Sequence, residues 1–225
     1  MSLRIALLGA ESTGKSSLAE ALTQALLAHS GLRVCWVPEL LRDWCVREGR
    51  TPVCEEQRAI AEAQHAAIES AAAQHELVIC DTTALMTAVY SEQVFGDASL
   101  HSWALDLQAG FDLNLLMGLD LPWVADGLQR DGPQVRAPVD QLLRRLLHTR
   151  RLPFSVVRGQ GQARVEAALN AITPLLSGRA PAASGLSGGL FSRLMAREAA
   201  LPQAGAWTCQ LCDDAGCEHQ LRRGG

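Results

Sequence analysis

Short apolar runs alternate with longer segments of helical periodicity along the first part of the chain. The apolar runs predict five strands, at residues 3–8, 33–39, 77–81, 111–120 and 154–159. Apolar or alanine-rich segments with a period near 3.6 predict the helices between them, at residues 15–28, 42–49, 55–76, 84–109 with a break near Gly96, 139–149 and 162–176.

Strands that alternate with helices predict an α/β fold, because each parallel pair of strands needs a crossover connection. We expect a five-stranded parallel sheet flanked by helices on both faces. In such sheets the ligands bind beyond the carboxyl ends of the strands. The candidate functional residues are therefore those that directly follow each strand.

The composition changes near residue 178 and divides the chain into three expected parts. Residues 1–177 form the α/β domain. Residues 178–205 are rich in Gly, Ser, Ala and Pro, which predicts a linker, and they include one short helical stretch, LFSRLMARE. Residues 206–225 form a small tail that carries cysteine and histidine.

Overall composition excludes several classes of protein. Hydrophobic residues make up 48% of the 225 residues and charged residues 20%, as in soluble globular proteins. The net charge of −4 argues against broad coating of nucleic acid or of an anionic membrane. No apolar run reaches the roughly 20 residues that span a bilayer, and no signal-like segment precedes the first strand. We expect a cytoplasmic protein with reduced cysteines at Cys35, Cys45, Cys54 and Cys80.

The segment GAESTGKS, between the first strand and the first helix, matches the phosphate-binding pattern G-x-x-x-x-G-K-[ST] in the context that the pattern requires. Backbone N–H groups of such a loop and the helix N-terminus bind phosphate. We expect Lys15 to reach the β- and γ-phosphates and Ser16 to bind Mg²⁺. The residues expected to bind ATP are Gly9, Glu11, Ser12, Thr13, Gly14, Lys15, Ser16 and Ser17.

Asp81 ends the wholly apolar strand LVICD, beside the expected phosphate loop. A carboxylate in this position is suited to hold Mg²⁺ through water, which is the role we favour. The alternative is that Asp81 caps the N-terminus of the helix that follows, where aspartate is also common.

Glu39 and Arg42 follow the second strand, in VPELLRDW. A carboxylate at this strand end is placed to orient an acceptor hydroxyl and take its proton, and Arg42 to bind a charged group or hold Glu39. The alternative, an exposed acid at a helix start with a surface ion pair, is equally consistent with the sequence.

Residues 121–138 hold three prolines and two glycines, which predicts a loop. Asp126, Arg130 and Arg136 lie in it. An arginine-bearing loop after the fourth strand suits a lid that excludes water and stabilises the charge on a transferring phosphoryl group. An ordinary solvated loop is the alternative.

The tail offers Cys209, Cys212, Cys217 and His219 as ligands. Three thiolates and an imidazole suit tetrahedral Zn²⁺, and C-x-x-C is a common first half of such a site, although the closing C-x-H is shorter than usual. A zinc site and free thiols remain equally open.

Together these segments resemble the ribosylnicotinamide kinases of the NadR type, a family of P-loop kinases. The resemblance covers residues 1 to about 177 and rests on the order and spacing of GAESTGKSSL, VPELLRDW, Gln64, VICDTT, FDLNLL and PWVADGLQR with Arg136. It implies the P-loop kinase fold with a lid loop, and the kinase domain only, because the phosphate loop begins at residue 9 and leaves no room for an adenylyltransferase domain before it.

The resemblance also implies an activity, namely ATP-dependent phosphorylation of the ribose 5′-hydroxyl of nicotinamide riboside, a step of NAD biosynthesis. The residues implied in catalysis are Lys15, Glu39, Asp81, Arg130 and Arg136. The residues implied in contacting the acceptor are Glu39, Arg42, Gln64, Asp81, Thr82 and Asp126.

Two other functions remain open from the sequence. The same P-loop chemistry serves other acceptors, such as a deoxynucleoside or a nucleoside monophosphate. A nucleotide-dependent regulatory module, in which ATP binding switches a surface, is a third hypothesis. The paired arginines of the loop favour phosphoryl transfer over switching.

Overall fold

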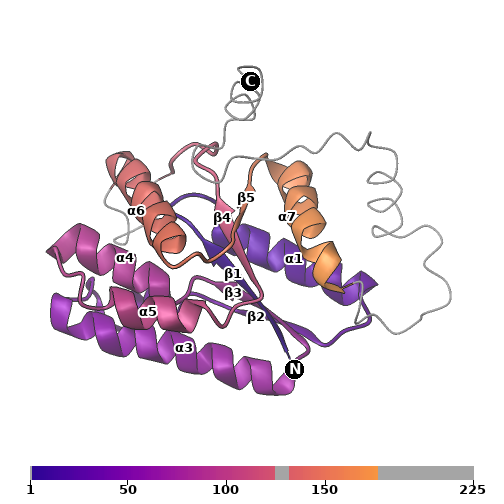
Figure 1. Cartoon of the computed structure of the whole chain (residues 1–225), viewed down its shortest axis with the longest axis horizontal. Helices are drawn as coiled ribbons and strands as arrows, with labels where there is room; N and C mark the ends of the chain where they lie inside the picture. Colours follow the sequence, from indigo (N-terminus) through magenta and orange to yellow (C-terminus); the bar gives the residue numbers. More distant parts are fainter. Residues whose placement is uncertain (1, 125–131, 177–225) are drawn as a thin grey trace, which may run out of the picture.

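A computed structural model describes residues 2–124 and 132–176. Its centre is a five-stranded, wholly parallel sheet, as predicted (Figure 1). The strands are β1 (Leu3–Leu8), β2 (Val34–Val37), β3 (Leu77–Asp81), β4 (Leu113–Met117) and β5 (Ser155–Val157). Their order across the sheet is β2-β3-β1-β4-β5, which places β1 in the middle.

Seven α-helices connect or follow these strands within the described ranges. They are α1 (Lys15–His29), α2 (Leu40–Glu48), α3 (Gln57–Gln74), α4 (Ala84–Phe95), α5 (His101–Gln108), α6 (Arg136–Thr149) and α7 (Gly161–Leu176). Two 3₁₀ turns, η1 (Cys54–Glu56) and η3 (Pro133–Val135), precede α3 and α6. The break expected near Gly96 is confirmed, because Gly96 ends α4 in the left-handed conformation with φ of 71°.

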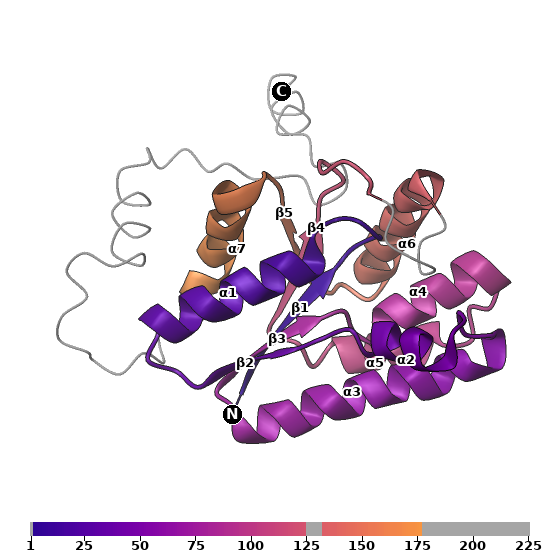
Figure 2. The ribbon, with the colours of Figure 1, turned by 180° about the vertical axis from the view of Figure 1, so that it is seen from behind.

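Alternate residues of the strands build two hydrophobic layers. Leu3, Ile5 and Leu7 of β1 pack with buried leucines of α1 and with α7. Ala6 and Leu8 face the other way and pack with α4, α5 and α6. Figures 1 and 2 show the same division, with α1 and α7 on one face of the sheet and α3, α4, α5 and α6 on the other. This period of two explains why the strands read as continuous apolar runs: both faces are buried.

Most predicted elements are shifted by one or two residues at an end, and two elements differ by three. The fourth strand covers 113–117 and not 111–120, because its pairing with β1 begins at Leu113 and the chain on either side turns away. Helix α6 begins at Arg136, inside the segment predicted to be a loop up to residue 138. Pro138 is compatible with this start, because N–H groups in the first turn of a helix have no intrahelical partner to lose.

Within the described residues, none of the helices combines the length and the apolar character needed to cross a bilayer. The described part of the chain ends with α7 at Leu176. The predicted linker, residues 178–205, and the predicted tail, residues 206–225, therefore lie outside the described residues. The zinc site at Cys209, Cys212, Cys217 and His219 therefore stays a prediction.

Candidate active site

The phosphate loop has the backbone that its sequence predicts. Gly9 has φ of 150° and Gly14 has φ of 77°, and Ser12 also adopts a positive φ of 55°. A Cβ on Gly9 would lie 2.9 Å from the Met117 Cβ, and one on Gly14 would lie 2.9 Å from the Leu121 Cδ1. Both glycines of the motif are thus required, by backbone conformation and by the close approach of the chain at the end of β4.

Lys15 begins α1 and its ammonium lies against the loop. Its Nζ donates to the carbonyl oxygens of Gly9 at 2.9 Å and Ala10 at 3.0 Å, and the Thr13 hydroxyl also donates to Ala10, at 2.7 Å. These short-range bonds hold the loop in its wrapped shape. Lys15 is also the only lysine in the sequence.

Asp81 lies beside the phosphate loop, since its Cα pairs with that of Leu7 in β1. The side chain is 1% exposed, and its Oδ1 has no hydrogen-bond partner among the described residues. Burial raises the pKa of Asp81 and the charge of Glu39 adds to this, while a hydrogen bond from Ser16 and the charges of Lys15 and Arg42 oppose it. A buried carboxylate with a bare oxygen beside a serine hydroxyl matches the oxygen ligands that Mg²⁺ takes.

The alternative role for Asp81, as a helix cap, is wrong. Thr83 is the N-cap of α4, and its Oγ1 accepts a hydrogen bond from the Leu85 N–H at 3.3 Å. Between the two, Thr82 has φ of 71°, which is unusual for a β-branched residue, and its N–H donates to the Leu7 carbonyl at 3.2 Å. The chain therefore turns sharply after Asp81, and the Asp81 carboxylate is not used to cap α4.

Glu39 is the N-cap residue of α2, but its side chain makes no capping hydrogen bond. Its Oε2 accepts instead from the Arg42 Nε at 3.0 Å, in a pair whose side chains are 20% and 44% exposed. Gln64 of α3 holds the backbone on both sides of Glu39, through bonds to Leu40 and Pro38. The charges of Glu39, Arg42 and Lys15 each contribute to the shift in the pKa of Asp81, so all three side chains lie near its carboxyl group.

Side chains within the phosphate loop bind the chain that leaves β4. The Glu11 Oε1 accepts from the Trp123 Nε1 at 2.8 Å and from the Gly132 N–H at 3.0 Å. The Ser12 Oγ accepts from the Val124 N–H at 2.8 Å, and the Glu11 N–H donates to the Tyr90 hydroxyl at 2.9 Å. Sequence reasoning missed Tyr90 and this role of Trp123, because both contacts join residues far apart in the chain.

Arg164 of α7 is a further residue beside the phosphate loop that the sequence analysis missed. It is 4% exposed, and its two terminal nitrogens donate to the carbonyls of Thr13 at 2.9 Å, Gly159 at 2.8 Å and Gly118 at 3.4 Å, and to Asp120 at 3.2 Å. It thus joins the phosphate loop to the ends of β4 and β5. A signal was present, because Arg164 precedes Ala168 and Ile172 at helical spacing, in a stripe otherwise apolar and buried.

The expected lid arginines have different outcomes. Arg136 does not lie in a loop, since it is the first residue of α6 and is 8% exposed. Its Nε and Nη2 have no hydrogen-bond partner among the described residues. A buried guanidinium with unused donors suits an anionic ligand. Asp126 and Arg130 lie outside the described residues.

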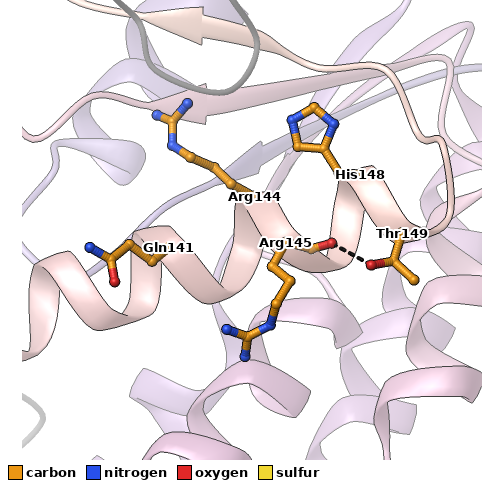
Figure 3. A pocket seen from close by; sticks show the side chains of 5 residues that line it. All are labelled: Gln141, Arg144, Arg145, His148 and Thr149. Atoms are coloured by element: carbon orange, nitrogen blue, oxygen red, sulfur yellow. Dashed lines mark hydrogen bonds between the residues drawn. The ribbon is translucent and has the colours of Figure 1, made fainter.

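A hollow of about 390 Å³ lies on the second half of α6, at the end of the helix away from η3 (Figure 3). Arg144 and His148 project to one side of the helix and Arg145 to the other (Figure 3). Arg144 is paired with Asp140 at 2.8 Å and Arg145 with Glu92 at 3.5 Å. Because these cations are paired and do not converge, we assign the hollow no ligand.

Comparison with known families supports the nucleotide-binding fold. The AAA-domain family matches residues 4–164, about the whole of the sheet and its helices up to the start of α7. The chain belongs to this AAA-domain family. A search of curated proteins gives no match.

Solved structures share the P-loop kinase fold. A NadR protein in complex with NR has a TM-score of 0.62 and 18% identity over 82% of this chain and 54% of its own. A NadR protein with NAD and AMP-PNP has a TM-score of 0.59 and 18% identity, over 77% of this chain and 49% of its own. A thymidylate kinase from Ehrlichia chaffeensis has a TM-score of 0.56 and 18% identity, over 77% of this chain and 98% of its own.

The protein spans about half the length of the NadR proteins that it resembles. Identities of 18% establish a common fold and leave the reaction open. The predicted fold class, a five-stranded parallel sheet of the P-loop kinase type, is confirmed.

Proposed function

We propose that this protein is an ATP-dependent kinase that phosphorylates the 5′-hydroxyl of nicotinamide riboside and yields nicotinamide mononucleotide. One observation carries the proposal: a phosphate loop, a buried carboxylate with a bare oxygen and a second carboxylate follow three adjacent strands, β1, β3 and β2. A protein that only bound phosphate would need the phosphate loop and neither of the two carboxylates. The other two supply the parts that phosphoryl transfer to an acceptor requires.

ATP binds with its phosphates along residues 9–17, where backbone N–H groups and the N-terminus of α1 meet the negative charge. Lys15 exchanges its carbonyl partners in the loop for the β- and γ-phosphates. Ser16 and Asp81 would hold Mg²⁺, directly or through water, and the cation supplies charge neutralisation on the phosphates. The bare Oδ1 of Asp81 is the observation that supports this ligand set.

The acceptor approaches from the β2–β3 side of the sheet, where Glu39 lies. Its hydroxyl proton passes to the Glu39 carboxylate as the hydroxyl oxygen bonds to the γ-phosphorus. The bond between the γ-phosphorus and the bridging oxygen breaks, and ADP leaves with that electron pair. Arg42 donates a hydrogen bond of 3.0 Å to the Glu39 carboxylate.

The remaining residues of the site follow from the resemblance to ribosylnicotinamide kinases. Arg136 and Arg130 stabilise the charge on the transferring group, and the two unused donors of Arg136 support its part in this. The resemblance also assigns contacts with the acceptor to Thr82 and to Asp126, the second of which lies outside the described residues. The occurrence of the fold in a NadR protein crystallised with NR supports nicotinamide riboside as that acceptor.

A nucleoside monophosphate is the second candidate acceptor. The thymidylate kinase structure has nearly the same TM-score as the NadR proteins, and this chain covers 98% of it. The chemistry on the side of the donor phosphates is the same for both acceptors, so Lys15, Ser16 and Asp81 keep their roles. A monophosphate attacks through an ionised oxygen, so Glu39 then has no proton to accept.

An acceptor panel tests the proposal. The purified chain is incubated with γ-labelled ATP and Mg²⁺, and with nicotinamide riboside, thymidine, deoxyadenosine, thymidylate or no acceptor. We expect label on nicotinamide riboside, with release into water at least about tenfold slower because transfer sites exclude water. Label on thymidylate would establish the second candidate. Label released only as inorganic phosphate, whatever the acceptor, would contradict both.

A further inference from the structure

Gln64 lies on α3, 24 and 26 residues along the chain from its two hydrogen-bond partners, Leu40 and Pro38. Its Oε1 accepts a hydrogen bond from the Leu40 N–H at 2.8 Å, and its Nε2 donates to the Pro38 carbonyl at 3.1 Å. The side chain is 3% exposed. Both bonds require this orientation of the amide, because the N–H of Leu40 needs an acceptor and the carbonyl of Pro38 needs a donor.

The two bonded groups belong to the peptide units on either side of Glu39. In a sheet, the carbonyl of residue i−1 and the N–H of residue i+1 point to the same side and pair with one residue of the neighbouring strand. The pairing of β2 with β3 ends at Val37 and Cys80. On β2 the odd-numbered residues face β3, since the Arg33 carbonyl accepts from the Leu77 N–H, so the Pro38 carbonyl and the Leu40 N–H do not belong to that ladder. The Gln64 amide supplies the donor and the acceptor that one residue of a neighbouring strand would supply.

Among the described residues, the hydrogen bonds that Glu39 itself makes are long or exposed: its carbonyl accepts from the Arg42 N–H at 3.3 Å, and its carboxylate accepts from the Arg42 side chain. Its backbone is extended, with φ of −70° and ψ of 103°, and its side chain makes no cap. The ion pair with Arg42 is partly exposed, and such pairs contribute little to holding a conformation. The buried amide of Gln64 therefore determines where the Cα of Glu39 lies, and with it the reach of the carboxylate.

We propose that Gln64 is a positioning residue, which acts on phosphoryl transfer by holding the peptide units on both sides of Glu39. This rests on the proposed function, in which Glu39 accepts the proton of the acceptor hydroxyl. It differs from the role implied by the resemblance, a contact with the acceptor, because both polar atoms of the amide are already bonded to backbone.

A double-mutant cycle tests the coupling. Gln64→Met keeps the length of the side chain and removes both bonds, and we expect kcat to fall by about 10- to 100-fold with the ATP KM within about twofold, since misplacing a catalytic group by 1 Å has such effects. In a Glu39→Gln background the same change should alter kcat less than about twofold, because it acts through Glu39. Additive losses would overturn the proposal, as would a rise in acceptor KM at constant kcat, the result expected of a direct contact.

A control separates this effect from loss of stability. Asn114 is also buried and also uses its amide, accepting from Gln108 at 2.6 Å and donating to the Pro153 carbonyl at 3.0 Å, but it lies near the amino end of β4. Asn114→Leu should lower the melting temperature comparably and leave kcat within about twofold. If both variants lose activity in step with stability, Gln64 is only structural and the proposal is wrong.

Hydrogen exchange tests the geometry without any acceptor. In the wild-type protein the Leu40 N–H is bonded to a buried amide, so it should exchange slowly, and Gln64→Met should speed its exchange at least about tenfold while Asn114→Leu does not. Gln64→Asn, whose amide is too short for both bonds, should behave like Gln64→Met. If Glu39→Gln leaves kcat unchanged, the base assignment of the proposed function fails. If Glu39→Gln lowers kcat and Gln64→Met does not, only the positioning role fails.

Discussion

The two halves of the sheet edge that flank the phosphate loop are built differently. On the β4–β5 side, Arg164 donates to four residues and ties the loop to the neighbouring strand ends. On the β3–β2 side, Asp81 keeps a buried oxygen without a partner among the described residues, and Glu39 carries only a partly exposed ion pair. In the first half Arg164 lacks a partner among the described residues only at its Nε, and its two terminal nitrogens are fully used, whereas in the second half a buried carboxylate oxygen is left for a ligand. Polar groups left unsatisfied in a folded protein therefore point to the chemistry more directly than satisfied ones do.

Replacing Lys15 should have the largest effect on activity, because Lys15 belongs to the phosphate loop, which lies between the two halves. We expect Lys15→Met to lower kcat/KM by about a thousandfold, because the phosphates lose their principal cation during transfer. Since Lys15 is the only lysine, an amine-acylating reagent also reports on it alone among the side chains. ATP should protect this lysine from acylation, as measured by peptide mass spectrometry. Full acylation at saturating ATP would contradict the assignment.

Replacing Glu39 tests the acceptor half separately. Glu39→Gln should lower kcat about a hundredfold, the usual contribution of a general base, and leave the ATP KM within about twofold. The matched control is Glu48→Gln, at the end of the same helix, where the carboxylate pairs with Arg47 at 2.9 Å. Steady-state kinetics of both variants decide the matter. Equal effects of the two changes would show that Glu39 is an ordinary surface acid.

Replacing Arg164 tests the claim that the β4–β5 half is structural. Arg164→Met should lower the free energy of unfolding by about 2–3 kcal/mol, because three carbonyls and Asp120 lose a buried donor. Arg42→Met, on the other half, should cost less than about 0.5 kcal/mol. Denaturant titration measures both. Similar losses for the two variants would remove the contrast between the halves.

The same comparison has a pH dependence with a definite sign. Burial raises the pKa of Asp120, but hydrogen bonds from the Gly159 N–H and from Arg164 outweigh it, so that the pKa is lowered overall. A carboxyl whose pKa is lower in the folded state stabilises the protein above its unfolded pKa and loses this as the pH falls. The difference in the free energy of unfolding between the wild type and Arg164→Met should thus be largest at pH 7 and should decrease as the pH falls and Asp120 becomes protonated.

Replacing Asp81 should change stability less than replacing Arg164 does, and in the opposite direction. Burial raises the pKa of Asp81, so its charged form destabilises the folded protein at neutral pH. In the presence of EDTA, Asp81→Asn should raise the free energy of unfolding by about 1 kcal/mol at pH 7.5, and less at lower pH where the wild-type carboxyl is protonated. Turnover should fall in the same variant. Thermal unfolding that shows a loss of stability would mean that Asp81 is a satisfied structural group.

Sequence patterns were sufficient where the cause is local. The strand at 3–8, the glycine loop and the break at Gly96 follow from apolar runs and backbone conformation within a few residues. Arg164 and Tyr90 were missed because their partners are 151 and 79 residues away, and only the strand order brings them together. The wrong location of Arg136 came from reading Pro138 as a helix breaker, which it is not in a first turn.

The position of β1 at the centre of the sheet has a consequence for how specificity can change. In the proposed function, the proton acceptor Glu39 and its positioning residue Gln64 come from one continuous stretch, residues 34–74, which contains β2, α2 and α3. The phosphate loop precedes this stretch and Arg164 follows it. A new acceptor preference can thus be acquired by exchanging a single cassette of the chain, while the machinery that holds the donor phosphates is inherited unaltered.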